Sequence, residues 1–380
     1  MSLKIIFIVH NLFFPGGTNK AIINLANGLA EAGHKVAITS VIARKQSFLF
    51  ELHSAIELDT IVPYDLKHPK GIIINRLRKY TPLFKPVIMS EQETGYDQYN
   101  RYIEYKIKEY VSLQSNCYII GTRPIINMLI ADSEAPAVHK IGMEHAILNS
   151  HAPTIQKKMK NYYHQLDVLT TLTEQDLIDY KKLLPELTVD VLPNIVTVNA
   201  KPKTKRNIIV AAGRFEYEKG FDLLIEAVHL SHDIITAHQY KVELYGSGSE
   251  REKLESLIKQ YHLQKLITIL PPHEHLDEII ASSAITCVPS RFEGFGMVIF
   301  EAMLLRSLVI TFDCPNGPKE LLTDQLNALK AEEQNIQSLS NKINSAITSN
   351  NDLIIEQGYV KAQSYNCASI INRFLKILPL

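Results

Sequence analysis

The feature that most constrains the fold of this 380-residue chain is an alternation of short apolar strands with segments of helical periodicity. Residues 4–10 have the pattern of a buried strand, 19–32 place apolar residues at helical spacing, and 35–41 are a second strand. The alternation restarts at residue 207 and continues to residue 312. Strands that alternate with helices in this way are typical of a parallel sheet covered on both faces. The sequence therefore predicts an α/β fold.

A stretch rich in Lys and Pro, residues 197–206, separates the two series and is the best linker candidate. The chain is also longer than the ~250–300 residues at which single cores stop growing. We therefore predict two Rossmann-like β/α/β domains, residues 1–192 and 193–355. The remaining residues, 356–380, are expected to be helical and can cross back to the N-terminal domain.

Composition excludes several classes of protein. With 46% hydrophobic and 21% charged residues, the chain is neither disordered nor fibrous. The balance of 40 basic and 40 acidic residues argues against a general nucleic-acid binder. The four cysteines are far apart, without the spacing of a disulfide framework or a zinc site, so a reducing cytoplasm fits best. No apolar segment approaches the ~18–20 residues of a spanning helix, and the first apolar run is too short for a signal peptide.

Ligands of open α/β sheets bind beyond the carboxyl ends of the strands, so the loops there are the candidate sites. The loop 213–220 carries Arg214 and Lys219, two cations that can clamp a diphosphate from two sides. The neighbouring residues Glu216 and Glu218 leave open the alternative that these cations form surface ion pairs.

A second loop, 290–296, carries Glu293 and leads into a helix that contains Glu301. Carboxylates accept hydrogen bonds from the vicinal hydroxyls of sugars and ribose. The alternatives are a charge favoured by the helix dipole and, for Glu301, a solvated helix face. The apolar neighbours Phe300 and Ala302 instead favour partial burial of Glu301, and buried carboxylates usually have a partner.

Two loops of the first half carry weaker signals. Gly16 and Gly17 precede the first helix, where glycines let a ligand approach the backbone and N–H groups can meet an anion. A turn with a helix cap explains them equally well. His145 follows the strand predicted at 137–143 and can donate or accept a hydrogen bond near neutral pH. A structural histidine with satisfied hydrogen bonds is the alternative.

Together, Gly213-Arg214, Lys219-Gly220 and the segment from Glu293-Gly294-Phe295-Gly296 to Glu301 resemble the retaining, nucleotide-sugar-dependent glycosyltransferases of family 4, which have the GT-B fold. The stretch Asp313-Cys314-Pro315-Asn316-Gly317-Pro318-Lys319-Glu320 looks like the branch that builds capsule, O-antigen and related bacterial surface glycans. The resemblance is specific over about residues 190–320 and thin over 42–140.

The resemblance implies two Rossmann-like domains that face each other across a cleft, and the transfer of a hexose or N-acetylhexosamine from a nucleotide-diphosphate sugar. UDP is the expected carrier, and a glycan or a lipid-linked molecule the expected acceptor. The implied catalytic residues are His145, Arg214, Lys219 and Glu293. The implied donor-binding residues are Gly16, Gly17, Arg214, Lys219, Glu293, Gly294, Phe295, Gly296 and Glu301.

In this family, Arg214 and Lys219 would hold the diphosphate and stabilise the leaving nucleotide, which is the task of a metal in other transferases. The sequence contains no Asp-x-Asp motif, so a metal-independent enzyme without a further cofactor is expected. Retention fits a front-face displacement in which positioning and electrostatics supply most of the catalysis.

Two other functions stay open: a nucleotide-sugar 2-epimerase with the GT-B fold, and a catalytically inactive partner of a transferase. The basic segment 65–88, interleaved with apolar and aromatic residues, is compatible with peripheral binding to an anionic membrane. A solvated helix with a packed apolar face is the competing interpretation of that segment.

Overall fold

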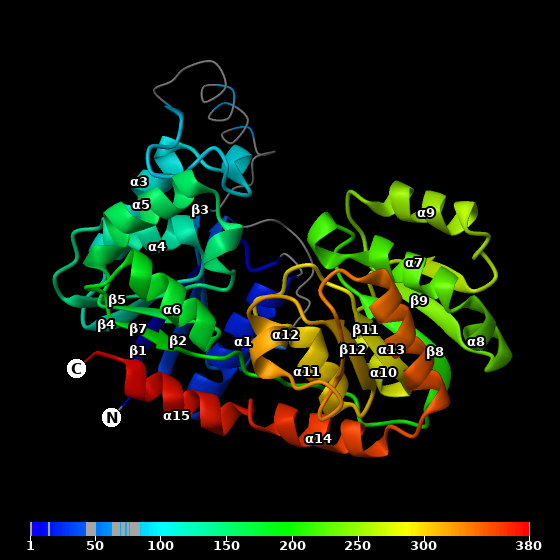
Figure 1. Ribbon diagram of the computed structural model, residues 1–380. Helices are drawn as coiled ribbons and strands as arrows, with labels where there is room; N and C mark the ends of the chain where they lie inside the picture. Colours follow the sequence, from blue (N-terminus) through cyan, green and yellow to red (C-terminus); the bar gives the residue numbers. More distant parts are fainter. Residues whose placement is uncertain are drawn as a thin grey trace. The chain divides into compact units, whose positions relative to one another are not determined.

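The computed structural model describes residues 2–13, 16–42, 51–62, 69, 73, 76 and 84–379. The chain forms two compact units, residues 1–195 with 367–380, and residues 196–366. Each unit is built on one parallel sheet with helices around it (Figure 1). The prediction of two Rossmann-like β/α/β domains is confirmed.

The sheet of the first unit has the strand order β3-β2-β1-β4-β5-β6-β7, and all neighbours pair in parallel. Its strands are β1 (Lys4–Val9), β2 (Lys35–Ile42), β3 (Glu57–Val62), β4 (Cys117–Gly121), β5 (Val138–Met143), β6 (Val168–Thr171) and β7 (Val189–Val191). All residues of β1 after Lys4 are buried, as expected for a central strand with both faces covered.

Helices surround this first sheet. They are α1 (Gly17–Glu31), α3 (Arg101–Ser112), α4 (Pro124–Ala131), α5 (Pro153–Tyr162), α6 (Glu174–Leu183) and α15 (Cys367–Ile377), with single 3-10 turns η2 (Tyr96–Gln98), η3 (Leu148–Ser150) and η4 (Tyr163–Gln165). Side-chain caps start two of them, because Asn100 accepts from Ile103 N–H at α3 and Thr173 accepts from Asp176 N–H at α6. Gly33 after α1 has φ 85°, a left-handed conformation that suits glycine.

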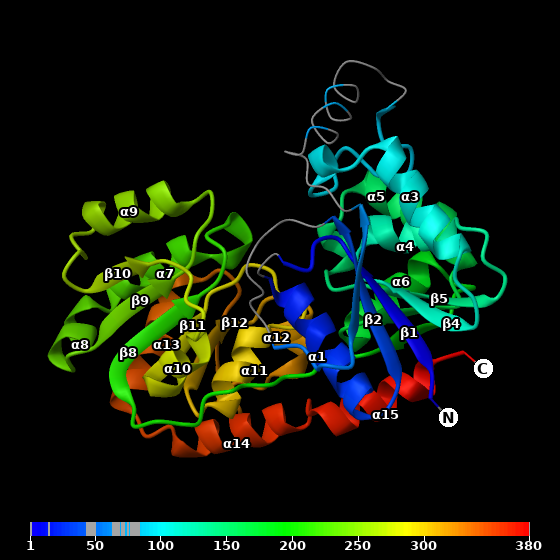
Figure 2. The ribbon, with the colours of Figure 1, turned by 180° about the vertical axis from the view of Figure 1, so that it is seen from behind.

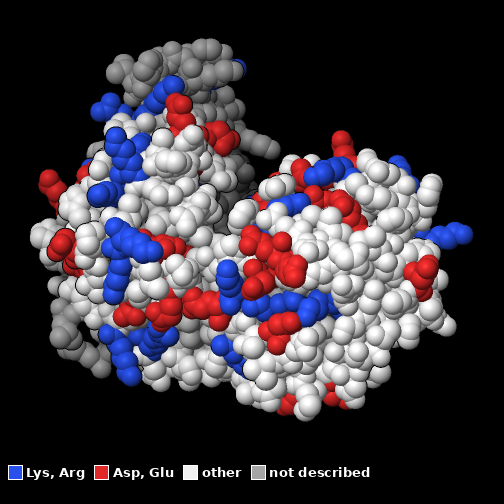
Figure 3. Space-filling view, in the orientation of Figure 1, with Lys and Arg blue, Asp and Glu red and all other residues white. Residues whose placement is uncertain are grey.

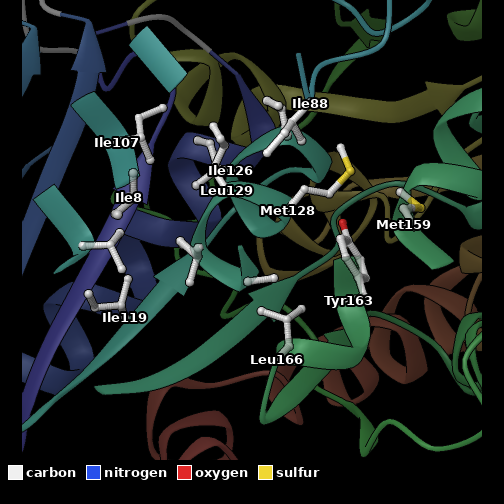
Figure 4. Close-up of a cluster of buried hydrophobic side chains, with 14 of the residues drawn as sticks. Ile8, Ile88, Ile107, Ile119, Ile126, Met128, Leu129, Met159, Tyr163 and Leu166 are labelled. Atoms are coloured by element: carbon white, nitrogen blue, oxygen red, sulfur yellow. The ribbon is translucent and has the colours of Figure 1, made fainter. Parts of the chain in front are cut away.

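The core of the first unit lies between its sheet and helices α3, α4 and α5. Figure 4 shows Ile8 and Ile119 from the strands, Leu129 from α4, and Met159 and Tyr163 from α5 and η4 in one cluster. All five of these side chains are fully buried. The packing holds the ends of β4 and β5, and therefore the loops that follow them, in fixed positions.

The sheet of the second unit has the order β10-β9-β8-β11-β12-β13, again with parallel neighbours. Its strands are β8 (Arg206–Ala212), β9 (Lys241–Tyr245), β10 (Ile267–Leu270), β11 (Ser283–Val288), β12 (Leu308–Phe312) and β13 (Leu329–Ala331). Its helical segments are η5 (Tyr217–Lys219), α7 (Phe221–Leu230), α8 (His232–Ala237), α9 (Arg251–Gln260), α10 (Leu276–Ser282), α11 (Met297–Leu304), α12 (Gly317–Leu321), α13 (Ile336–Thr348) and α14 (Asp352–Gln363).

The two C-terminal helices belong to different units. Helix α14 packs against α11 of the second unit, whereas α15 packs beside α1 of the first (Figure 2). A Cβ at Gly28 of α1 would lie 2.4 Å from Sγ of Cys367, so this glycine is what lets α15 approach. Ile370, Ile371 and Phe374 of α15 are buried there. Residues 356–366, which the sequence grouped with the C-terminal segment, therefore lie in the second unit.

The second alternating series, predicted from residue 207 to residue 312, corresponds to β8 through β12, which run from Arg206 to Phe312. The sequence missed several elements: β3, β7, α3, α4 and α6 of the first unit, and β13, α8 and α13 of the second. In β3 the first three residues are exposed, so it lacks the continuous apolar run that marked the other strands. On the face shown in Figure 3, basic and acidic side chains lie interspersed rather than gathered into one large patch.

Candidate functional site

The strand order brings the two strongest candidate loops together. The loop 213–220 follows β8 and the loop 289–296 follows β11, and these two strands are neighbours in the middle of the second sheet. The chain order of the strands reverses between them, because β9 and β10 lie on one side and β12 and β13 on the other. Such a switch point is where open α/β sheets bind their ligands.

Lys219 and Glu293 meet at this point. Nζ of Lys219 donates to Oε2 of Glu293 at 2.7 Å, and Oγ of Ser290 donates to the same oxygen at 3.0 Å. The lysine side chain is 24% exposed and the glutamate side chain 15%, so solvent reaches both. Because both groups are accessible, a ligand can replace their mutual contact: the ammonium can bind its phosphate and the carboxylate its hydroxyl groups.

Arg214 has a different partner. Its Nη2 lies 2.9 Å from Oε1 of Glu218, and its side chain is 61% exposed. Glu216 binds Ser249 instead, and the hydrogen bonds from that residue hold the pKa of Glu216 below its usual value. The alternative of surface ion pairs thus describes Arg214 in this structure, while Lys219 is the cation that the fold places next to Glu293.

The backbone around Glu293 is tightly constrained. Gly296 has φ 84°, and a Cβ there would lie 2.7 Å from Cδ1 of Ile299. The Phe295 ring is buried against Phe300 and Tyr365, with centroid separations of 4.7 and 5.1 Å. The side chain of Phe295 therefore anchors the loop, and only its backbone is placed to meet a ligand.

The stretch after β12 packs against the backbone of the same loop. Gly317 N–H donates to the Glu293 carbonyl at 3.1 Å, and a Cβ at Gly317 would lie 2.8 Å from the carbonyl oxygens of Glu293 and Gly294. Asn316, with φ 66°, forms an isolated bridge with Glu293. The stretch 313–320 is thus part of the frame that holds Glu293.

Glu301 lies in the second turn of α11 and is buried. Of the two interpretations drawn from the sequence, burial describes its environment and a solvated helix face does not. A carboxylate at this position is able to accept hydrogen bonds from the vicinal hydroxyl groups of a ligand.

A glycine loop after β9, which was not among the predicted sites, packs on the same region. A Cβ at Gly246 would lie 2.0 Å from the Gly213 carbonyl, and Phe215 N–H donates to the Ser247 carbonyl at 2.8 Å. Gly248 has φ 158° and sits against the backbone of Phe215. The loop is therefore packed on the segment that carries Arg214. Two glycines directly after a predicted strand were the available signal.

The glycines of the first unit stand at the start of α1. Gly17 is the first helical residue, and an added Cβ at Gly16 or Gly17 would meet no atom within 4 Å. Both positions are thus open to approach by another molecule. Pro15, which the sequence grouped with them, lies outside the described residues.

His145 follows β5 and is neutral at pH 7. Both ring nitrogens are buried without a hydrogen-bond partner among the described residues. Burial lowers the pKa of His145 to about 4. A neutral imidazole can donate or accept one hydrogen bond, but it adds no positive charge that could stabilise a phosphate.

The residue before it, Glu144, belongs to a buried polar cluster that the sequence did not reveal. The carboxylate accepts hydrogen bonds from Asn127 Nδ2 at 2.8 Å and from the hydroxyl of Tyr163. His151 Nε2 lies 3.7 Å from its second oxygen. Burial also raises the pKa of the nearby Glu93. The two hydrogen-bond donors Asn127 and Tyr163 are 17 and 19 positions from Glu144, so no local motif reveals them.

Within the described ranges, no helix is long and apolar enough to cross a bilayer, and no group of three or more His, Cys, Asp or Glu side chains could hold a metal ion. The basic segment 65–88 lies mostly outside the described residues. Lys85, inside them, pairs with Glu91 at 3.4 Å on the surface.

Comparison with known proteins finds a family match in the second half of the chain. Residues 197–360 match the family described as glycosyl transferases group 1. An uncharacterized glycosyltransferase of Haemophilus influenzae is 23% identical over 386 aligned residues, which cover 99% of each chain. The poly(ribitol-phosphate) alpha-N-acetylglucosaminyltransferase of Staphylococcus aureus is 24% identical, over 58% of this chain and 46% of its own length.

Solved structures agree over the whole length. A variant of TarM from S. aureus, in complex with fondaparinux, alpha-GlcNAc-glycerol and UDP, superposes with a TM-score of 0.80 at 16% identity and covers 99% of both chains. HepE from Anabaena, in complex with UDP and glucose, gives a TM-score of 0.76 at 16% identity and covers 98% of both. The predicted resemblance is confirmed: the chain is a glycosyltransferase with the GT-B fold, and its residues 197–360 form a glycosyl transferases group 1 domain.

Proposed function

We propose that this enzyme transfers a hexose or N-acetylhexosamine from a nucleotide-diphosphate sugar, with UDP as the carrier, to a glycan or lipid-linked acceptor, and that it does so with retention at the sugar carbon. Synthesis of bacterial surface polysaccharide is the proposed setting. The bound UDP in the TarM and HepE structures, and the glycan-synthesising relatives, support this choice of donor and pathway.

The observation that carries the proposal is the accessible Lys219–Glu293 pair at the switch point between β8 and β11. A donor offers one group for each partner, since its diphosphate suits the ammonium and its sugar hydroxyls suit the carboxylate. Glu301 is assigned to the ribose hydroxyls. The N–H groups of Gly294, Phe295 and Gly296 are assigned to the donor sugar together with Glu293.

Arg214 completes the diphosphate site by changing partners. Its pair with Glu218 is exposed, and such pairs contribute only about 0–1 kcal/mol. Charge-assisted bonds between a guanidinium and a diphosphate are stronger, because the planar group donates two parallel hydrogen bonds. Arg214 therefore leaves Glu218 at little cost when the donor binds.

In the proposed reaction, the bond between the anomeric carbon and the diphosphate oxygen breaks while the acceptor oxygen bonds to the same face of that carbon. The acceptor proton passes to the departing phosphate oxygen, and the electron pair of the broken bond stays on the diphosphate. Lys219 and Arg214 stabilise the negative charge that develops there, a role that commonly contributes several kcal/mol. No metal is assigned to the step, and the predicted roles of Gly16, Gly17 and His145 stay predictions.

The proposal is tested by incubating the purified protein with UDP-glucose, UDP-galactose, UDP-GlcNAc and UDP-GalNAc, each with and without a panel of glycan and polyprenyl-linked acceptors. We expect acceptor-dependent release of UDP, a product with the anomeric configuration of the donor, and full activity in EDTA. The exposed pair Lys203–Glu278, at the opposite end of β8, supplies a matched control, and Lys203→Ala should transfer sugar at the wild-type rate.

Each other outcome has a definite meaning. An isomerised donor without acceptor consumption would identify the 2-epimerase instead. Binding of UDP without any turnover would favour an inactive partner. A product of inverted configuration would leave the transferase assignment standing and contradict the front-face mechanism.

A further inference from the structure

A buried arginine joins the two loops that carry Lys219 and Glu293. Arg291 follows β11, and its side chain is 6% exposed. Its guanidinium makes two parallel hydrogen bonds to Asp222 of α7, from Nη1 to Oδ1 and from Nη2 to Oδ2, both at 2.9 Å. Although burial opposes ionisation of Asp222, the bonds from Arg291 and Lys253 hold its pKa below the usual value. The positive charge of Arg291 is thus balanced inside the protein.

The same arginine holds the turn η5 in three further ways. Nη1 donates to the Tyr217 carbonyl at 2.7 Å, and the guanidinium carbon lies 4.1 Å from the centroid of the Tyr217 ring. The backbone N–H of Arg291 donates to the Glu218 carbonyl at 2.8 Å. Two of the three residues of η5 are therefore tied to Arg291, and the third residue of that turn is Lys219.

We propose that Arg291 is a positioning residue of the donor site: it fixes η5 against the loop after β11, so that the Lys219 ammonium is in place to receive the terminal phosphate of a nucleoside diphosphate. The inference rests on the proposed function and assigns no contact with the donor to Arg291. Pre-organisation of this kind matters because a displacement of about 1 Å at a reacting group can lower a rate ~100-fold.

The contact set explains why the residue is an arginine. A planar guanidinium can donate to two carboxylate oxygens and a carbonyl at once while one face stacks on an aromatic ring. A lysine at 291 would keep the charge but offers a single point of donation. Arg291→Lys therefore removes the geometry and leaves the charge, which makes it the informative substitution.

Arg306 provides a matched control in the same unit. It also pairs with a carboxylate, Glu356, and its guanidinium carbon lies 4.2 Å from the centroid of the Tyr359 ring. These partners lie on α14, away from η5 and from Glu293. Arg306→Lys thus changes the same kind of contact without touching the proposed donor site.

The experiment compares the dissociation constants of UDP and UMP by calorimetry for the wild type, Arg291→Lys, Lys219→Ala, the double variant and Arg306→Lys. We expect Arg291→Lys to weaken UDP binding ~10- to 100-fold and UMP binding only ~2-fold, with Arg306→Lys unchanged in both. In the Lys219→Ala background, Arg291→Lys should have little further effect, because it acts through Lys219.

An equal loss of UDP and UMP affinity, or effects of Arg291→Lys and Lys219→Ala that simply add, would show that Arg291 only stabilises the fold and would overturn the inference. Should Arg291→Lys fail to fold, as judged by its melting curve, Asp222→Asn keeps the side-chain volume and gives the same comparison. If the wild type binds none of UDP, GDP and ADP, the proposed function itself is contradicted. If the wild type binds UDP, and Arg291→Lys leaves the ratio of the UDP and UMP dissociation constants unaltered, only the positioning role is overturned.

Discussion

Two glutamates, one in each unit, follow a strand inside a parallel sheet and are held in different ways. Glu293 after β11 faces a lysine ammonium and a serine hydroxyl, and solvent reaches it. Glu144 after β5 is 2% exposed and is bound by an asparagine amide and a tyrosine hydroxyl, both uncharged. Both carboxylates have partners, but only Glu293 has one that a solvent-borne ligand can replace.

This difference distinguishes a carboxylate that can bind a ligand from one that has a structural role. An accessible carboxylate balanced by a mobile cation can exchange that cation's contact for a ligand's hydroxyl group at low cost. A buried carboxylate held by fixed, neutral donors would leave those donors unsatisfied if it moved. We therefore assign Glu293 to substrate and Glu144 to the architecture of the loop that carries His145.

The largest expected effect is on the accessible pair. Lys219→Ala removes the cation that stabilises the leaving diphosphate, so kcat/KM for sugar transfer should fall ~100- to 1,000-fold. The melting temperature should stay within a few degrees, because the lost ion pair is partly exposed. Steady-state kinetics with a nucleotide-release assay measure the effect. Near-native transfer by this variant would remove Lys219 from the catalytic machinery.

The buried carboxylate should show the opposite behaviour. Glu144→Ala leaves the Asn127 amide and the Tyr163 hydroxyl without their acceptor, which should lower the free energy of unfolding by about 3 kcal/mol. Turnover per folded molecule should change much less than for Lys219→Ala. Denaturant titration and active-site titration together measure both quantities, with the exposed Glu186→Ala as a control expected within about 0.5 kcal/mol of wild type. A stable but inactive Glu144→Ala protein would assign a catalytic role to this residue.

His145 tests the comparison through pH. Its folded-state pKa of about 4 lies below the value of 6.5 for an unperturbed histidine, so the unfolded chain binds the extra proton between these values. The stability from a neutral His145 is complete above pH 6.5 and is lost as the pH falls, by about 2 kcal/mol at pH 5. Denaturant unfolding at pH 8 and pH 5 should show that His145→Gln loses less stability on acidification than wild type. The control variant His238→Gln, at an exposed position, should lose as much stability between pH 8 and pH 5 as the wild type. An equal loss of stability in His145→Gln and His238→Gln would contradict burial of the His145 ring.

The smallest effect is expected at Arg214. Glu218→Gln removes its exposed partner and one negative charge near the proposed diphosphate site, so UDP should bind ~2- to 5-fold more tightly. Calorimetric titration detects a change of this size. Glu278→Gln, which removes the partner of Lys203, is the matched control and should not alter UDP affinity. Weaker UDP binding by Glu218→Gln would mean that Glu218 holds Arg214 in its productive position.

The sequence was sufficient for the fold class and for the loops of the second unit, because β8, β9, β11 and β12 each carry a strong local pattern of apolar residues followed by turn residues. It placed Lys219 and Glu293 on two candidate loops. It could not show that they touch, since they are 74 residues apart and meet only through the strand order.

The same limit explains what was overlooked. Arg291 lies inside the candidate loop 290–296, yet its bonds to Asp222 and Tyr217 span 69 and 74 residues. Glu144 was adjacent to the proposed catalytic histidine, but its partners come from α4 and η4. Long-range polar contacts depend on the packing of the whole unit, and no local spacing encodes them.

The path of the chain through the two units has a consequence for biosynthesis. The second unit is one continuous stretch, whereas the first needs residues 367–380 to cover α1 around Gly28. On the ribosome, domains generally fold as units in the order in which they emerge. Here the later-made unit has its whole sheet and core available before the earlier-made unit receives its last helix. Until α15 docks, the first unit keeps an apolar surface that attracts chaperones, and nascent chains stopped before residue 367 should remain bound to them.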